Sequence, residues 1–119
     1  MRQISFSLTK GPVRRRTKTV TRRLGWRTLK VGEVLQGIEQ GQGLKAGARG
    51  IPICQVRIID VRREPLGAIL DEPNGCAREG FPEMSPAAFI RMFCQTHPPC
   101  QPETEITRIE LAYVTEAGR

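Results

Sequence analysis

The sequence has no acidic residue before Glu33. A segment that carries cations and no anion cannot neutralise its own charge, so it favours an anionic partner, and nucleic acid is the commonest one. The whole chain carries a formal net charge of +7, and binding to a polyanion would weaken as salt is added. The cations of this first segment are Arg2, Lys10, Arg14, Arg15, Arg16, Lys18, Arg22, Arg23, Arg27 and Lys30.

Long apolar runs are also missing. The apolar alternation from Ile4 to Leu8 is too short for a membrane span or a signal peptide, so we expect a cytoplasmic protein without a membrane partner. The glycines between Gly37 and Gly50 do not follow the strand, G-x-G-x-x-G, helix order, which argues against a dinucleotide site. We interpret the stretch from Gly37 to Gly50 as a mobile loop or a loose hairpin.

Paired cysteines at zinc-finger spacing are absent as well. The chain has four cysteines and one histidine, and in the cytoplasm the thiols would stay reduced, which disfavours a Cys94–Cys100 disulfide. Cys94, His97 and Cys100 form a C-x-x-H-x-x-C pattern that could supply three zinc ligands, with Cys54 or Cys76 as a fourth. Because the second ligand pair is missing, the pattern favours two small buried thiols at a helix end. We predict neither a metal nor another cofactor.

The length of 119 residues fits a single domain, 1–119, with a modest core. The sequence predicts a helix that begins at Ser85, a good N-cap, with Pro86 in the first helical position. Alternating and buried apolar patterns predict strands. The order of strands and helices indicates the α+β class with a small curled sheet or barrel. We expect a monomer or a weak homodimer. The predicted strands cover 4–8, 51–61 and 104–114, another begins after Gly32, and a short helix covers 65–71.

The densest basic stretch runs from Arg14 to Arg23. The β-branched residues Thr19, Val20 and Thr21 within it suit an ordered extended segment. We therefore predict an ordered loop or strand edge with a basic surface, and Trp26 at the rim of the core or stacked on a base. The predicted substrate-binding residues are Arg14, Arg15, Arg16, Arg22, Arg23 and Trp26.

Within this stretch, Lys18, Thr21 and Arg23 follow the spacing K-x-x-T-x-R. In an extended segment residues 21 and 23 share a face while residue 18 points away, so a bend must gather all three. A desolvated lysine can activate a threonine as a nucleophile, and an arginine can hold a phosphate, a carboxylate or an oxyanion. The alternative is a simple phosphate-binding surface. Glu79, beside Gly80, is either a proton shuttle near Lys18 or a surface carboxylate.

The chain resembles the ASCH domain family of the PUA-like superfamily from about Ile4 to Tyr113. The family signature is G-x-K-x-x-x-x-R, in which Lys18 and Arg23 fit and Arg16 replaces the glycine. The resemblance implies a small PUA-like β-barrel of about five to six strands flanked by short helices, with a cleft for RNA or a nucleotide. It rests on these stretches: 18–23, Trp26, 29–35, 78–81, 89–93 and 107–111.

One branch of that family, the small amidohydrolases that deacetylate N4-acetylcytidine, is similar in four positions. Lys18, Thr21, Arg23 and Glu79 stand where those enzymes have their lysine, threonine, arginine and glutamate. The resemblance implies that Thr21 is the nucleophile, Lys18 its base, Glu79 the proton donor to the leaving amine and Arg23 a positioning group.

We therefore predict an RNA- or nucleotide-binding domain with a basic cleft, whose partner is RNA or a modified nucleoside. The matching quartet adds the hypothesis of a hydrolase that cleaves an N4-acetylcytidine-like amide. The flanking arginines instead favour a polymeric substrate, which leaves a metal-independent ribonuclease or a non-catalytic RNA-binding module as alternatives.

Overall fold

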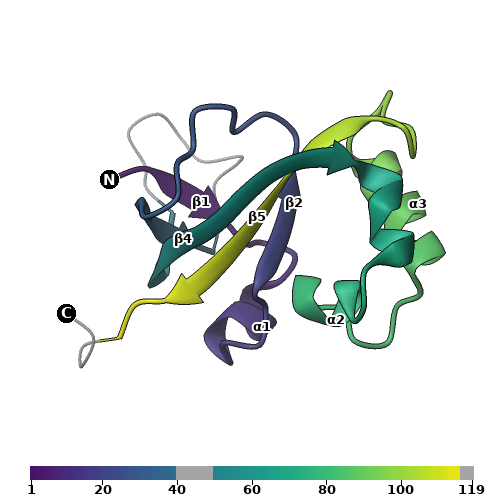
Figure 1. Ribbon diagram of the computed structural model, residues 1–119. Helices are drawn as coiled ribbons and strands as arrows, with labels where there is room; N and C mark the ends of the chain where they lie inside the picture. Colours follow the sequence, from purple (N-terminus) through teal and green to yellow (C-terminus); the bar gives the residue numbers. More distant parts are fainter. Residues whose placement is uncertain (40–49, 116–119) are drawn as a thin grey trace.

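The computed structural model describes residues 1–39 and 50–115, and most of the predicted Gly37–Gly50 loop lies outside them. The described residues form a five-stranded sheet of order β1-β3-β4-β5-β2, with η1, α2 and α3 gathered at one end and α1 packed separately against the sheet (Figure 1). The strands are β1 (Gln3–Ser5), β2 (Val20–Arg23), β3 (Val34–Ile38), β4 (Pro52–Pro65) and β5 (Glu105–Tyr113). The helices are α1 (Lys10–Arg14), the 3-10 helix η1 (Leu66–Asp71), α2 (Gly75–Glu79) and α3 (Pro86–Thr96).

The sheet is mixed and open. β1 runs parallel to β3, whereas the β3–β4, β4–β5 and β5–β2 pairs are antiparallel. Within the described part of the chain, β1 and β2 are the two edges and do not pair with each other. The α+β class is confirmed, but the prediction of a closed barrel is wrong, since edge strands of three and four residues are too short to complete the closure.

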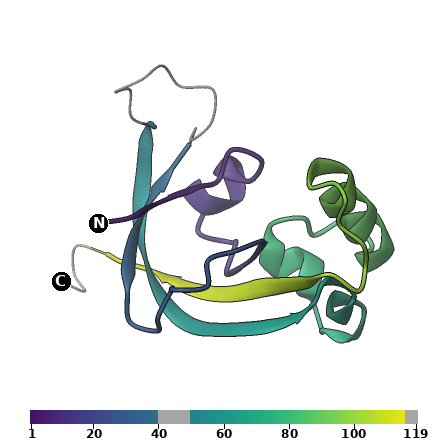
Figure 2. The ribbon, with the colours of Figure 1, turned by 90° about the horizontal axis from the view of Figure 1, so that it is seen from above.

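The long strand β4 connects the two ends of the molecule. Its first half pairs with β3 and it pairs with β5 from Val56 to Pro65, with a register shift between Ile58 and Asp60. An extra residue of this kind bends a strand, and β4 curves strongly along its length (Figure 2). The strand predicted over 51–61 is therefore confirmed and extends further than expected.

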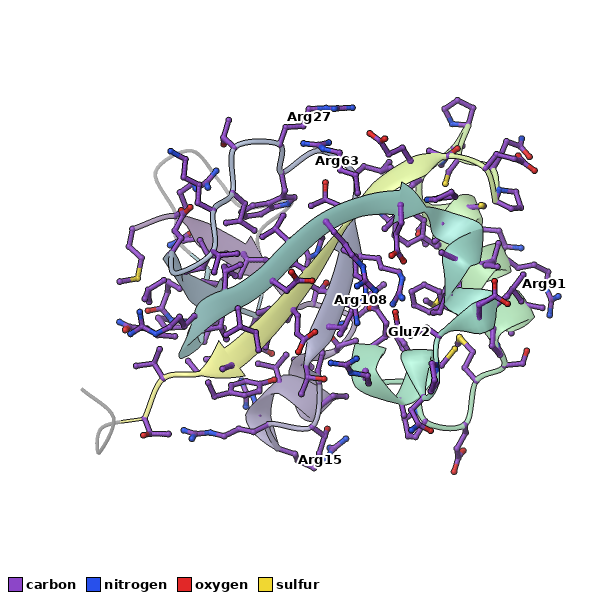
Figure 3. The ribbon with its side chains drawn as sticks, viewed as in Figure 1. Arg15, Arg27, Arg63, Glu72, Arg91 and Arg108 are labelled. Carbon is purple, nitrogen blue, oxygen red and sulfur yellow. The ribbon has the colours of Figure 1, made fainter. Side chains whose placement is uncertain are left out.

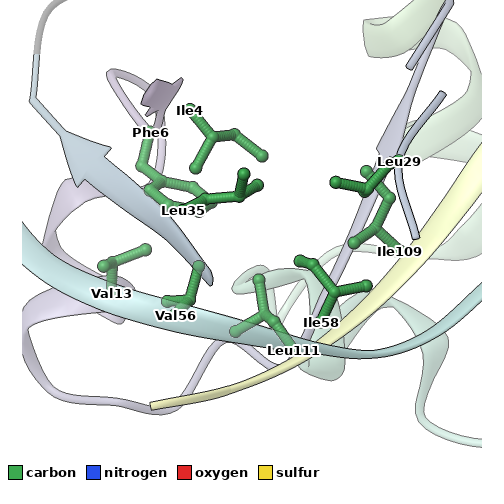
Figure 4. Close-up of a cluster of buried hydrophobic side chains, with 9 residues drawn as sticks. All are labelled: Ile4, Phe6, Val13, Leu29, Leu35, Val56, Ile58, Ile109 and Leu111. Carbon is green, nitrogen blue, oxygen red and sulfur yellow. The ribbon is translucent and has the colours of Figure 1, made fainter. Parts of the chain in front are cut away.

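Two apolar clusters form the core. The first joins Val13 of α1 to residues of the sheet, and Figure 4 shows its side chains grouped together; Trp26 packs at its margin, which confirms the predicted rim position. The second lies between η1, α2, α3 and the start of β5. The first cluster contains Ile4, Phe6, Val13, Leu29, Leu35, Val56, Ile58, Ile109 and Leu111, and the second contains Leu66, Ile69, Cys76, Phe89, Ile90, Phe93, Cys100 and Ile106.

The helix predicted from Ser85 is confirmed, because the Ser85 hydroxyl accepts a hydrogen bond from the Ala88 N–H at 3.1 Å. The basic stretch was predicted as an ordered loop or strand edge, which is confirmed for residues 15–23 and is wrong only at Arg14. Arg14 ends helix α1, and only the later part forms the edge strand β2. Pro12 does not prevent this helix because it lies in the first turn, where its missing N–H leaves no bond unmade.

Gly37, at the start of the predicted mobile loop or loose hairpin, lies in β3 and pairs with Cys54 in the antiparallel β3–β4 pair. A Cβ atom at this position would come within 3.0 Å of the Cys54 carbonyl oxygen and 3.1 Å of the Phe6 ring, so the close packing of Phe6 on the sheet requires a glycine. In the described ranges we find no helix with the length and apolar character needed to cross a membrane.

Candidate functional site

A cavity of about 590 Å³ opens between the edge strands β1 and β2 on one side and helices α2 and α3 on the other. Charged and hydroxyl side chains from the basic stretch and from α2 line one part of it. Aromatic and thioether side chains from α3 and the preceding loop line another. The first group comprises Lys18, Thr21, Arg22, Arg23 and Glu79, and the second comprises Phe81, Phe89, Met92, Phe93 and His97.

Helix α2 brings Glu79 to the basic stretch. The Thr19 N–H donates to the Arg78 carbonyl at 2.8 Å, which fixes the end of α2 against the residues before β2. Gly80 then ends the helix with a φ of 102°, and a Cβ there would lie 3.1 Å from Pro12. Glycine is therefore needed both for the left-handed backbone and for this approach. Glu79 is left buried, with its side chain directed at Lys18.

Lys18 and Glu79 form a buried ion pair. Lys18 Nζ donates to the Glu79 carbonyl oxygen at 2.6 Å and to its Oε1 at 3.0 Å, and both side chains are almost fully buried. Burial lowers the pKa of Lys18, Glu79 opposes this change, and the charges of Arg23 and Arg22 add to it. An ammonium has three hydrogens, so one remains after these two contacts.

Arg22 shares the same carboxylate from the opposite side. Its Nη1 donates to Glu79 Oε2 at 3.0 Å, and its Nη2 donates to Glu72 Oε1 at 2.7 Å. Arg108 donates to both oxygens of Glu72, at 2.8 and 3.1 Å, and the two side chains meet beside α2 in Figure 3. A continuous charged network thus runs from Lys18 to Arg108 and fixes the orientation of Glu79.

Arg23 is held differently. Its Nε donates to Thr21 Oγ1 at 2.9 Å, its Nη2 donates to the Ser5 carbonyl at 2.6 Å, and its guanidinium lies 5.4 Å from the Phe6 ring centre. Within residues 1–39 and 50–115 it forms no ion pair with a carboxylate. Burial lowers the pKa of Arg23 to about 10, with Glu79 opposing. Its remaining donors have no carboxylate to neutralise them, which favours an acceptor group on a ligand.

The contact with Ser5 also joins the two sheet edges. Ser5 ends β1 and Arg23 ends β2, so one side chain spans the gap that backbone pairing leaves open. The same side chain fixes the Thr21 hydroxyl as an acceptor, which leaves the hydroxyl hydrogen of Thr21 free to donate.

The structure thus brings Lys18, Thr21, Arg22, Arg23 and Glu79 to one cavity. Lys18 lies in the loop before β2, which begins only at Val20, so its side chain is not bound to the alternation of that strand. Buried and paired with Lys18, Glu79 is not the surface carboxylate that was one of its two interpretations.

The other predicted binding residues do not line this cavity. Arg14 pairs with Glu39, Arg16 lies over the Tyr113 ring, and Arg15 lies at the end of α1 (Figure 3). Trp26 contacts Arg2, whose guanidinium is 5.4 Å from its ring. A substrate-binding role for these four residues therefore stays a prediction and would involve an outer surface.

No group of three or more His, Cys, Asp or Glu side chains within the described ranges is arranged to hold a metal ion. His97 stacks on Phe93 with ring centres 4.3 Å apart, and its Nδ1 lies 3.0 Å from the Phe93 carbonyl oxygen. Cys94 and Cys100 are both free thiols and pack in the second core cluster.

Sequence reasoning missed two parts of the site. Phe89, Met92 and Phe93 of the helix predicted from Ser85 were not singled out as site residues, but they pack in the second core cluster and also line the cavity. The spacing on the helix predicts an apolar face but does not say what that face meets. Glu72 and Arg108, which form an ion pair beside the site, were not singled out as site residues.

The sequence matches no protein-family model, and a search of the curated proteins found no match either. Solved structures do match. A mutant of the ASCH protein from Zymomonas mobilis has a TM-score of 0.61 at 11% identity, covering 98% of this chain and 74% of that one. The ASCH domain from Lactobacillus crispatus has a TM-score of 0.54 at 13% identity, covering 94% and 79%.

A hypothetical protein of known structure matches with a TM-score of 0.67 at 15% identity, over 96% of this chain and 100% of that one. Identities this low carry an argument about the fold and not about activity. The described chain therefore has the fold of the ASCH domains, in agreement with the resemblance found in its sequence.

Proposed function

We propose that this chain is an ASCH-type domain that binds a nucleoside unit, free or within RNA, in the cavity between β1, β2 and α3. The observation that carries the proposal is that Arg23 pairs with no carboxylate among the described residues and lines the same cavity as an aromatic wall. A nucleobase has a flat apolar face and a polar edge. The face suits Phe81, Phe89 and Phe93, and the edge offers acceptors to the guanidinium.

The binding test is calorimetric titration of the protein with cytidine and with N4-acetylcytidine. Arg23→Gln should weaken binding about ten-fold or more, because a hydrogen bond from a charged donor contributes about 1.5–3 kcal/mol. Arg91→Gln removes an exposed cation on α3 outside the cavity and should leave the affinity unchanged. Equal losses in the two variants, with both still folded by circular dichroism, would overturn the proposal.

A second candidate function is hydrolysis of an N4-acyl amide, and the lowered pKa of the buried Lys18 favours it. In this reaction Thr21 Oγ bonds to the amide carbonyl carbon and its proton passes to Lys18. The C–N bond then breaks, the leaving amine takes a proton by way of Glu79, and water hydrolyses the ester on Thr21. Lys18 contacts Glu79 at 3.0 Å, so a proton can pass between them.

Acetate release from N4-acetylcytidine tests this reaction. It should be lost in Thr21→Val and Lys18→Met, and the wild-type rate should rise with pH until Lys18 has lost its proton, at a pH below its ordinary value of 10.5. Cleavage of single-stranded RNA by the wild type alone would instead support a metal-independent ribonuclease. Salt-sensitive RNA binding without turnover on either substrate would leave a binding module.

A further inference from the structure

The mouth of the cavity holds a second set of charges. Lys10 and Glu39 both line the cavity, and Lys10 Nζ donates to Glu39 Oε1 at 3.0 Å. Arg14 Nη2 donates to the other oxygen, Oε2, at 2.6 Å. Lys10 and Arg14 are four residues apart on α1, so they lie on the same side of the helix and hold the carboxylate between them.

These contacts differ from the buried ion pair of Lys18. The side chains of Lys10 and Arg14 are 56% and 54% exposed, whereas that of Glu39 is 21% exposed. Exposed ion pairs of this kind are weak, so another anion can take the place of the carboxylate at little cost. The backbone of Glu39 is fixed instead, since its carbonyl accepts from Ser7 at 2.6 Å and its N–H donates to the Ile51 carbonyl at 2.8 Å.

We propose that Lys10 and Arg14 form a phosphate subsite at the cavity mouth, and that Glu39 occupies it as an internal competitor until a phosphorylated ligand binds. The inference rests on the proposed function, because it places the phosphate of a nucleotide next to a base bound in the cavity. The subsite predicts that the protein prefers a ligand with a phosphate monoester or diester to a neutral nucleoside. Two cations facing one carboxylate leave a net positive charge, which a phosphate would complement.

The test compares the dissociation constants of cytidine and cytidine 5′-monophosphate by calorimetry at one fixed salt concentration. The wild type should bind the monophosphate more tightly. Lys10→Gln should reduce the ratio of the two affinities about three-fold, and Glu39→Gln should increase it by a similar factor, as expected for an exposed ion pair. The opposite signs separate this inference from a loss of folding, which would weaken binding in both variants, and thermal melting checks that each variant is folded.

Arg91→Gln is the control, because it removes an exposed cation on α3 that forms no ion pair in the described chain and does not line the cavity. It should not change the affinity ratio. A short single-stranded oligocytidylate in place of the monophosphate tells whether a diester in a chain serves as well as a terminal phosphate. The subsite is supported if the affinity ratio ranks Glu39→Gln above wild type and wild type above Lys10→Gln with the monophosphate and with the oligocytidylate alike.

The result that overturns the inference is tight binding of both ligands with an equal ratio in wild type, Lys10→Gln and Glu39→Gln. That outcome would leave the proposed function intact. If neither ligand binds the wild type, or if Arg23→Gln has no effect on cytidine, the proposed function fails first.

Discussion

At the scale of single residues, Glu79 is the residue on which the charged side of the site depends. It accepts from Lys18 on one oxygen and from Arg22 on the other, and all three side chains are buried. Buried charges of this kind need one another, because removing one leaves its partner buried without water or an opposite charge, which destabilises the folded state.

Glu79→Gln should therefore destabilise the protein by about 3–5 kcal/mol, since it leaves two cations buried with one carboxylate fewer. Urea unfolding at pH 7 measures this change. Glu83→Gln is the matched control, because Glu83 is exposed and forms no ion pair in the described chain, so its unfolding midpoint should match the wild type. A loss below about 1 kcal/mol for Glu79→Gln would contradict the buried geometry.

At the scale of elements, helix α3 supplies the apolar wall of the cavity and its position depends on its first turn. The Ser85 hydroxyl accepts from the Ala88 N–H, and no acidic residue assists in that turn. Ser85→Ala should cost about 1 kcal/mol of stability, whereas Ser85→Asp should retain most of it because aspartate also caps helices. Thermal unfolding of the three proteins measures the difference. Equal melting temperatures for alanine and aspartate would mean that the cap contributes nothing.

The elements also differ in how far the sequence determines them. Helix α3 was predictable because Ser85, Pro86 and the apolar spacing agree, and β5 because its alternation is long. Helix α1 was not, because five residues give no helical period and its stability comes from burying Val13 in the first cluster. The open sheet was not predictable either, since closure depends on strand lengths and not on the pattern within a strand.

The candidate site was predictable from the sequence only where its residues follow a local spacing or a family pattern. Lys18, Thr21, Arg23 and Glu79 were found through spacing and family resemblance, and all four line one cavity. Glu72 is distant in sequence from Arg22 and Arg108, so only the folded chain reveals that they meet. Local sequence does not encode a contact between three separate elements.

At the scale of the whole molecule, the Glu72 network links the end of η1 to β2 and β5. Burial would raise the pKa of Glu72, but the hydrogen bonds from Arg108 and the charges of Arg22, Arg108 and Arg78 lower it below the ordinary value of 4.5. A carboxyl group whose pKa is lower in the folded state stabilises the fold above its unfolded pKa. That contribution is lost as the pH falls through the folded pKa.

Glu72→Gln should therefore be less stable than the wild type at pH 7 and should lose less stability between pH 7 and pH 3. Urea unfolding across this range measures the slope of stability against pH. Glu103→Gln, which replaces an exposed carboxylate without an ion pair in the described chain, should keep the wild-type slope. An unchanged slope for Glu72→Gln would mean that the network does not hold Glu72 ionised.

The place of β5 in the sheet has a consequence for synthesis of the protein. β5 lies between β4 and β2, and it pairs with Thr21, Arg22 and Arg23 through Ile109, Arg108 and Thr107. On a ribosome, β2 emerges early and must wait for a partner that is more than 80 residues away in the chain, as the pairing of Arg23 with Thr107 shows. During that interval its cations are exposed on a nascent chain beside the negatively charged ribosomal RNA. The strand that supplies Thr21, Arg22 and Arg23 to the cavity can therefore join the sheet only after β5 has been synthesised.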